Sequence, residues 1–348
     1  MSQYINKEAV RNPAPSRNGT RKVMGDLTNT NINGKNGHGS GNAQKKKKSS
    51  NTTATSYSSQ SPTSSTISVK SVDQQDSVVI KPRAPDDIDA RDINNPLMVS
   101  HYVQEIYVHM REKEKNSVNP NYMEMQPNIN KRMRHVLFDW LIEVHLKFKC
   151  VPETWFLTTN LIDRYLSCVE VERSKLQLIG VTAFMLAAKY EEIYPPELQD
   201  LVYITDRAYT KDEIMTMEVT MLKELDFKVT IASTHCFLVR YLKAAHADRR
   251  MVWLACFITE RVVHDYSMLN YLPSMIASCA VYLARKNLQR NPWSPTLLKY
   301  THYSESSLAP CLTAMTNIMN SKTNMNAVTK KYSSQKYGYV ATMSIEGV

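Results

Sequence analysis

Apolar residues recur three or four positions apart over most of this 348-residue chain, from Leu97 to about Met325. This spacing is typical of amphipathic helices, and short polar or proline-containing breaks divide it into separate segments. The region is also nearly free of glycine, which favours helix: Gly180 is the only one between Asn95 and Tyr337. We therefore predict an all-α protein. The expected helices are residues 100–112, 131–149, 153–168, 174–190, 197–202, 211–224, 234–245, 249–266, 271–287, 295–300 and 305–319.

A short repeat divides the helical region into two similar halves. The segment AFMLAAK at 183–189 is followed 97 residues later by AVYLARK at 280–286. Each copy lies on a helix that is apolar nearly all round, as the central helix of a bundle must be. With about five predicted helices around each copy, the repeat indicates two stacked helical bundles of one design. Only the first copy is followed by a charged cluster, Tyr190-Glu191-Glu192.

The two ends of the chain differ from this helical region. Residues 1 to about 90 are rich in Asn, Ser, Thr and Lys and poor in large apolar side chains, so they bury too little surface to fold. We predict a disordered basic regulatory tail over residues 1–96 that ends in a polar linker at 81–96. Residues 326–348 are expected to form a loosely ordered tail.

The net charge of +10 belongs mainly to the N-terminal tail. Residues 1–85 contain 13 Lys/Arg and 4 Asp/Glu, so they account for +9 of it. The rest of the chain is nearly neutral, whereas phosphate contacts need a basic face. The sequence therefore predicts no nucleic acid partner for the folded region.

The cysteine usage indicates a reducing compartment. The six cysteines form no C-x-x-C pair, follow no secretory signal and lie among apolar or helical neighbours: Cys150, Cys168, Cys236, Cys256, Cys279 and Cys311. We interpret them as reduced thiols of a protein of the nucleus and cytoplasm. No apolar run reaches the roughly 18 residues of a membrane span, so no membrane association is expected.

Four stretches closely resemble the cyclin box. They are MRHVLFDWL at 133–141, ETWFLTTNLIDRYL at 153–166, KLQLIGVTAFMLAAKYEEIYPPEL at 175–198 and YITDRAYTKDEI at 203–214. KYEEIYPPE together with YITDRAYT is most similar to mitotic cyclins of B type, with A type next. The resemblance covers about residues 97 to 325.

The resemblance implies both a fold and a function. The fold would be two tandem five-helix cyclin boxes, with a peripheral helix and the N-terminal box at 97–229 and the C-terminal box at 230–325. The function would be that of a regulatory subunit, without enzyme activity or cofactor of its own. Such a subunit binds and activates a cyclin-dependent Ser/Thr kinase, helps to select its substrates and controls mitosis.

The resemblance assigns the charged cluster at the end of the first repeat to kinase binding. In the family, the lysine and glutamate that match Lys189 and Glu218 together hold backbone of the kinase, and such groups can bond carbonyls and amides. Apolar residues around them would form the centre of the interface. The kinase-binding residues so implied are Lys189, Tyr190, Glu191, Glu192, Ile193, Glu218, Leu222 and Phe227. Without the resemblance, Lys189 would only offset the helix macrodipole and the glutamates would lie in a solvated loop.

The helix predicted at 100–112 carries two apolar stripes. Tyr102, Ile106 and Met110 share one, and Val103 and Tyr107 lie on an adjoining one. We expect one stripe to pack on the first box and the other, through Tyr102 and Ile106, to contact the kinase.

A second apolar stripe resembles the patch by which cyclins capture Arg-x-Leu segments of substrates and inhibitors. Met133, Leu137 and Trp140 lie on one helical face, a spacing that more often indicates a core. The resemblance adds Glu143 as the carboxylate for the arginine, and Leu176 with Gln177 for the peptide backbone. By contrast, Arg134 and Asp139 project away from this face and are interpreted as structural.

A segment of the tail resembles a destruction box, the R-x-x-L-x-x-x-x-N peptide that mitotic cyclins present to a ubiquitin ligase of the anaphase-promoting type. In RKVMGDLTN at 21–29, Arg21 and Asn29 match, and Met24 stands where leucine is usual. Methionine fills a leucine pocket with some loss, so a weakened degradation signal is expected. The lysine run 45–48 offers ubiquitin acceptors, or a weak import signal.

No catalytic or metal-binding motif is present in the sequence. The acidic run DDID at 86–89 resembles the Asp-rich metal motifs of prenyl-transfer enzymes, but it lies in the linker and lacks their D-D-x-x-D spacing. The alternative function is that of a two-box DNA-binding general transcription factor of the IIB class. A salt-dependent DNA-binding assay would distinguish it from a cyclin.

Overall fold

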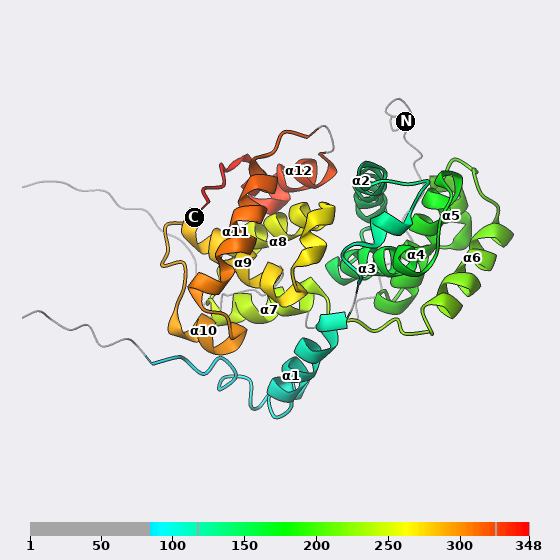
Figure 1. The fold of residues 1–348 in the computed structure, drawn as a ribbon. Helices are drawn as coiled ribbons and strands as arrows, with labels where there is room; N and C mark the ends of the chain where they lie inside the picture. Colours follow the sequence, from blue (N-terminus) through cyan, green and yellow to red (C-terminus); the bar gives the residue numbers. More distant parts are fainter. Residues whose placement is uncertain (1–83, 117, 324–325, 348) are drawn as a thin grey trace, which may run out of the picture. The chain divides into compact units, whose positions relative to one another are not determined.

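The computed structural model describes residues 84–116, 118–323 and 326–347, which belong to a single unit. These residues form helices and contain no strand (Figure 1). Every predicted helix is present, with ends that differ by at most three residues, so the all-α prediction is confirmed. The α-helices are α1 (Val103–Lys113), α2 (Lys131–Phe148), α3 (Pro152–Cys168), α4 (Leu176–Glu191), α5 (Leu198–Ile204), α6 (Lys211–Glu224), α7 (Thr234–Ala244), α8 (Arg249–Val263), α9 (Pro273–Asn287), α10 (Pro295–Thr301), α11 (Glu305–Asn320) and α12 (Ala327–Tyr332).

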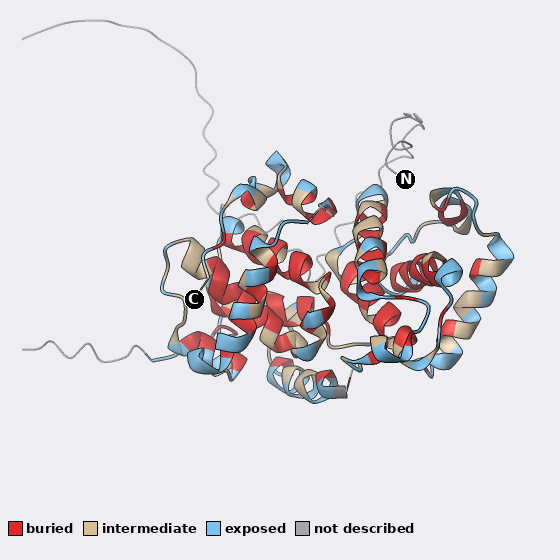
Figure 2. Cartoon of the chain, turned by 45° about the horizontal axis from the view of Figure 1, so that its top comes forward, coloured by how far each residue is buried: buried red, intermediate tan, exposed pale blue. Residues whose placement is uncertain are grey.

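Helices α2 to α6 form the first box around α4. Its side chains from Leu178 to Ala188 are all buried, and α4 is packed by α2, α3, α5 and α6. A helix apolar on every side is stable only when other helices surround it. Figure 2 shows the buried residues on the sides of the helices that face one another.

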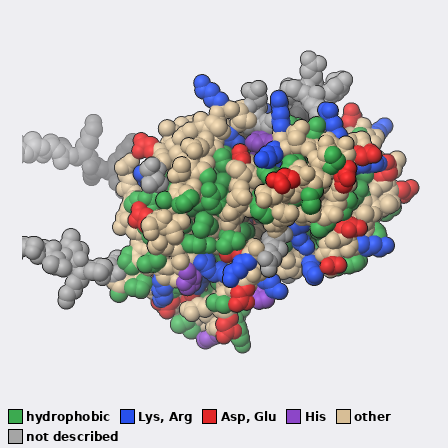
Figure 3. Space-filling model, viewed as in Figure 1, with side chains coloured by type: hydrophobic (Ala, Val, Ile, Leu, Met, Phe, Trp, Pro, Cys, Tyr) green, Lys and Arg blue, Asp and Glu red, His purple; other side chains and the backbone are tan. Residues whose placement is uncertain are grey.

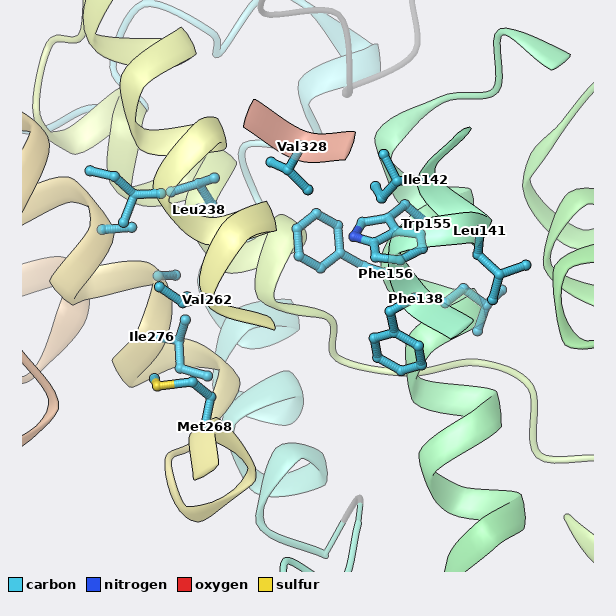
Figure 4. Close-up of a cluster of buried hydrophobic side chains, with 14 of the residues drawn as sticks. Phe138, Leu141, Ile142, Trp155, Phe156, Leu238, Val262, Met268, Ile276 and Val328 are labelled. Carbon is cyan, nitrogen blue, oxygen red and sulfur yellow. The ribbon is translucent and has the colours of Figure 1, made fainter. Parts of the chain in front are cut away.

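Helices α7 to α11 repeat this arrangement around α9. The second copy of the repeat lies on α9, whose neighbours are α7, α8 and α11. The two copies therefore mark the central helices of two bundles, as the sequence predicts. A continuous hydrophobic core joins the two bundles, and part of it is drawn in Figure 4, with Trp155 and Phe156 of the first bundle and Leu238 and Val262 of the second.

Local sequence signals fix where the site-bearing helices begin. The Asn130 side chain accepts a hydrogen bond from the Met133 N–H at 3.0 Å and so starts α2. Thr210 and Glu213 form a reciprocal capping box at the start of α6. Such caps satisfy N–H groups that a helix leaves unpaired, and each contributes about 1 kcal/mol.

A buried arginine of the first box pairs with an aspartate of the same box and also bonds the second box. Arg134 binds both carboxylate oxygens of Asp163, at 2.6 and 2.7 Å, and donates from Nη1 to the His264 carbonyl at 2.9 Å. Tyr122 donates to the same carboxylate at 2.8 Å. The structural interpretation of Arg134 is confirmed, and Asp139 likewise accepts a hydrogen bond from the Ala327 N–H of α12.

The C-terminal segment is not the loosely ordered tail that we expected for residues 326–348. Residues 327–332 form α12, which packs on α2 and α8 and buries Val328 and Tyr332. Lys331 is also buried, because its ammonium pairs with both carboxylate oxygens of Glu260 at 2.8 Å. A six-residue helix is too short to show periodicity, and the burial of the Lys331 charge is compensated only by a partner 71 residues away.

The described part of the predicted linker, residues 84–96, is also held in place. Ile88 and Asp89 are buried against the second box, where Asp89 pairs with Arg240. The partner is 151 residues away, so no local pattern could reveal it. Arg21, Met24 and Asn29 of the destruction-box motif lie outside the described residues.

Candidate functional site

A charged pair lies where α4 ends. Lys189, in the last turn of α4, points to Glu218 in the middle of α6, with Nζ 2.6 Å from Oε1. The Lys189 side chain is 50% exposed and that of Glu218 is 16% exposed. The structure therefore brings together the two residues that the resemblance selects. The two residues are thus already paired in the free chain, with Lys189 half exposed and Glu218 mostly buried.

Large apolar side chains are exposed near this pair. Tyr190, Ile193 and Phe227 are 51%, 59% and 66% exposed, whereas Leu222 is partly buried against the core. The Tyr190 hydroxyl hydrogen-bonds that of Thr230, which joins the end of α4 to the segment after α6. Exposed apolar residues gathered around a polar centre are typical of a protein-binding surface.

The end of α6 holds Phe227 in an unusual backbone conformation. Asp226 and Phe227 both have positive φ, 51° and 55°, and their N–H groups bond the Lys223 and Leu222 carbonyls at 3.0 and 2.8 Å. This is a Schellman motif without the usual glycine. A bulky residue in the left-handed region costs on the order of 1 kcal/mol or more. In this conformation the Phe227 side chain is exposed to solvent. Sequence patterns do not show such a backbone conformation.

Glu192 has a role inside its own box. Its Oε1 accepts hydrogen bonds from the Val151 N–H at 2.7 Å and the Thr154 hydroxyl at 2.6 Å. Helix α3 has no capping side chain of its own, so Glu192 supplies one from the end of α4. Glu191 lies at the surface, where partial desolvation of its carboxyl group, together with the nearby Glu153 and Glu192 carboxylates, raises its pKa.

Helix α1 packs on the second box. Tyr107 donates to the Cys236 carbonyl at 3.0 Å, and its ring lies 6.1 Å from that of Phe237. The expectation that one stripe packs on the first box is therefore wrong, because the partners of α1 come from α7 and α10 of the second box. Tyr102 and Ile106, at 63% and 40% exposed, remain open to solvent.

The substrate-docking stripe is part core and part surface. Leu137 is only 6% exposed because it lies on Gly180 of α4, where an added Cβ would be 2.7 Å from Leu137 Cδ1. Leu176 is also buried. The other members are partly exposed: Met133, Trp140, Glu143 and Gln177. The close approach of α2 and α4 at Gly180 thus buries Leu137, and the partly exposed members lie on the outer surface of these two helices.

The C-terminal helix α12 borders this surface. Lys330 lies 4.0 Å from Glu143, which is 38% exposed. Glu143 therefore already has one basic neighbour. Sequence patterns missed this neighbour because α12 itself escaped prediction.

The described residues offer neither a metal site nor a membrane span. Among residues 84–116, 118–323 and 326–347, no three His, Cys, Asp or Glu side chains group as metal ligands. Within the same ranges, each helix is too short or too polar to cross a bilayer. On the face drawn in Figure 3, acidic and basic side chains are interspersed.

Comparison with known proteins gives consistent matches. The model of the cyclin N-terminal domain matches residues 105–230, and that of the cyclin C-terminal domain matches residues 232–346. G2/mitotic-specific cyclin-1 of Medicago sativa subsp. varia is 44% identical over 260 residues, covering 73% of this chain and 60% of that protein. Cyclin-B2-4 of Arabidopsis thaliana is 42% identical over 266 residues, covering 75% and 62%. The chain thus spans about three fifths of the curated relatives it matches.

A solved structure shares the fold. The X-ray structure of a viral cyclin from herpesvirus saimiri superposes with a TM-score of 0.56 at 16% sequence identity. The superposition covers 63% of this chain and 97% of the viral cyclin. At this identity, the match extends to the arrangement of helices and not to individual site residues.

Proposed function

This chain belongs to the cyclin family, and from that premise we propose that it binds and activates a cyclin-dependent Ser/Thr kinase as a mitotic cyclin of B type. The observation that carries this proposal is the pairing of half-exposed Lys189 with Glu218, next to exposed apolar side chains at the ends of α4 and α6. The similarity to B-type cyclins of plants supports it. No favourable observation remains for the DNA-binding alternative of the IIB class.

The proposed mechanism needs no catalytic group from this chain. A kinase transfers phosphate well only when the glutamate of its helix C pairs with the active-site lysine and its activation loop is ordered. A partner that binds this active arrangement more tightly than the inactive one shifts the population towards it. We propose that Lys189 and Glu218 bind kinase backbone, while Tyr190, Ile193 and Phe227 cover apolar kinase surface.

We propose further that the protein acts in the nucleus and cytoplasm, where its six free cysteines remain reduced.

A pull-down of the tagged full chain from dividing cells, followed by identification of the bound kinase, tests the main proposal. Recovery of a cyclin-dependent kinase together with stimulated histone phosphorylation is the expected result. A chain that copurifies with no kinase and stimulates none would refute the proposal.

We propose that the surface around Trp140 captures Arg-x-Leu segments of substrates and inhibitors. Met133→Ala with Trp140→Ala and Gln177→Ala should raise KM for a substrate with this motif at least roughly tenfold, because the loss of a single anchor already costs about 1–2 kcal/mol. Leu137 is left intact because truncating a buried leucine destabilises the fold by about 2–5 kcal/mol.

The control substrate is a short peptide without the motif, and the control variant is Val136→Ala, an exposed position of the same helix. The kinase complex of the triple variant should phosphorylate the control peptide with unchanged KM, and that of Val136→Ala should phosphorylate both substrates with unchanged KM. Equal loss of activity toward the two substrates, in a variant with unchanged melting temperature, would assign these residues to kinase activation instead.

We propose that a ubiquitin ligase of the anaphase-promoting type recognises residues 21–29. Arg21→Ala with Met24→Ala should lengthen the half-life after mitosis at least severalfold and leave kinase activation intact. Met24→Leu should shorten it, because leucine restores the usual side chain. Lys22→Ala serves as the control within the segment. Equal half-lives for all four chains would exclude the destruction-box interpretation.

A further inference from the structure

The acidic run that resembled a metal motif has basic partners instead. We call residues Asp86–Asp92 the acidic strap. Three of its aspartates recur at every third position, and so do three basic residues on α7 and the turn after it. The pairs are Asp86–His246 at 3.2 Å, Asp89–Arg240 at 2.5 Å, Asp89–Lys243 at 2.8 Å and Asp92–Lys243 at 2.5 Å. Residues three apart lie on one face of a helix, so Arg240 and Lys243 project from the same side of α7. Because the aspartates pair with these residues, the strap runs along that side of α7.

Arg240 connects the strap to two helices. It is 4% exposed and holds both carboxylate oxygens of Asp89. Its guanidinium also lies over the ring of Tyr107 in α1, 5.2 Å from the centroid, and over that of Tyr300 in α10, 5.0 Å away. A bidentate pair on two aromatic faces is a rigid arrangement that lysine cannot reproduce.

Asp89 stays ionised in this buried position. Burial alone raises the pKa of its carboxyl group, but the hydrogen bonds and charges of Arg240 and Lys243 outweigh it and lower the pKa overall. The backbone of the strap is held as well, with the Asp86 N–H on Thr296 Oγ1 at 3.0 Å and the Ile88 N–H on the Tyr300 hydroxyl at 3.2 Å. The strap is therefore fixed to α7 and α10 at several points.

A continuous series of turns connects the strap to α1. Each turn is closed by a backbone hydrogen bond to a residue three positions earlier, and the closing bonds follow one another without a gap. They are Asp92 to Asp89, Asn95 to Asp92, Met98 to Asn95, Val99 to Pro96 and Tyr102 to Val99, at 2.9 to 3.4 Å. Displacement of the strap would therefore displace the start of α1.

Apart from the strap, the first turns of α1 are held by Val103, the only fully buried residue of this helix, and by Tyr107, which donates to the Cys236 carbonyl. At the opposite end, Glu114 accepts from the Ser274 N–H and hydroxyl at 2.8 and 2.7 Å, at the start of α9. The exposed Tyr102 and Ile106 thus lie between the strap on the N-terminal side and the contacts of Tyr107 and Glu114 on the C-terminal side.

We propose that the acidic strap positions α1 for kinase recognition, with Asp89 and Arg240 as positioning residues that themselves do not contact the kinase. The proposal rests on the proposed function. Without the strap, the first turns of α1 would leave the second box for part of the time. The apparent dissociation constant rises as the docked fraction falls, so a docked fraction of about one tenth gives about a tenfold weaker complex.

The test compares full-length chains that carry Asp89→Asn or Asp248→Asn. Asp248 also pairs with an arginine of the second box, Arg290, at 2.6 Å, but its ion pair and helix cap do not include α1. Calorimetry with a purified cyclin-dependent kinase should give about a tenfold higher Kd for Asp89→Asn and an unchanged Kd for Asp248→Asn. Asp92→Asn, which removes one contact, should have a smaller effect, and Asp89→Glu should recover part of the affinity.

Hydrogen exchange of the free chains provides a second measurement. Amides of residues 98–106 should exchange faster in Asp89→Asn than in the wild type, with α9 unchanged. Faster exchange without any change in Kd, or equal Kd changes in both variants, would overturn the positioning role. A wild-type chain that binds no kinase would refute the proposed function, and exchange would then still show whether the strap holds α1.

Discussion

Replacing Lys189 and Glu218 together by alanine should weaken kinase binding on the order of thirtyfold or more and leave the melting temperature almost unchanged. Loss of one member of a desolvated, hydrogen-bonded charge pair at an interface costs about 2–5 kcal/mol. In the free protein the same pair lies at the surface, with Lys189 half exposed, and surface ion pairs contribute about 0–1 kcal/mol. Binding and folding should therefore separate in this variant.

The double substitution is preferable to either single one. Lys189→Ala alone would leave Glu218, only 16% exposed, without its 2.6 Å partner, and the cost would then include an unpaired carboxylate in the free chain. Lys175→Ala is the matched control, because Lys175 pairs with Glu213 of α6 at the other end of α4, at 3.7 Å. Calorimetry and thermal melting are needed on each variant. Full affinity in the double variant, or a lowered melting temperature, would contradict the assignment.

The fold could be predicted where a segment carries its own signal. Helices α4 and α9 were identifiable because they are apolar on every side and share a repeat. Helix α12 and the acidic strap carry no such signal. Their order depends on Glu260 for Lys331 and on Arg240 for Asp89, partners 71 and 151 residues away. From the sequence alone, a charged residue is predicted to be exposed unless its distant counter-ion is known.

The same limit applies to the site residues. The resemblance selected Lys189 and Glu218, and the structure joins them. The resemblance could not show that Glu192 caps α3, because the two hydrogen bonds of this cap connect residues 41 and 38 positions apart. Nor could it show that Leu137 is buried, since this follows from the missing side chain at Gly180. Family motifs indicate which residues matter, whereas contacts between helices determine which of them remain available to a partner.

Removing the Asp163 carboxylate should lower the free energy of unfolding by about 3–5 kcal/mol, the usual cost of leaving a buried charge unpaired. Asp163 accepts from Arg134 Nε and Nη2 and from the Tyr122 hydroxyl, and both charged residues are almost fully buried. Burial alone lowers the pKa of the Arg134 guanidinium, but Asp163 raises it above its ordinary value. In Asp163→Ala the arginine would remain charged without its counter-ion.

Urea denaturation followed by fluorescence and circular dichroism measures this loss. Asp248→Asn, which breaks an exposed pair but keeps a good N-cap residue, should cost about 1 kcal/mol or less. Arg134→Met with Asp163→Ala removes both buried charges, so it should be less destabilised than Asp163→Ala alone. If the double variant unfolds at the same urea concentration or lower, the loss comes from packing and from the Arg134 bond to the His264 carbonyl. The unpaired charge would then not be its cause.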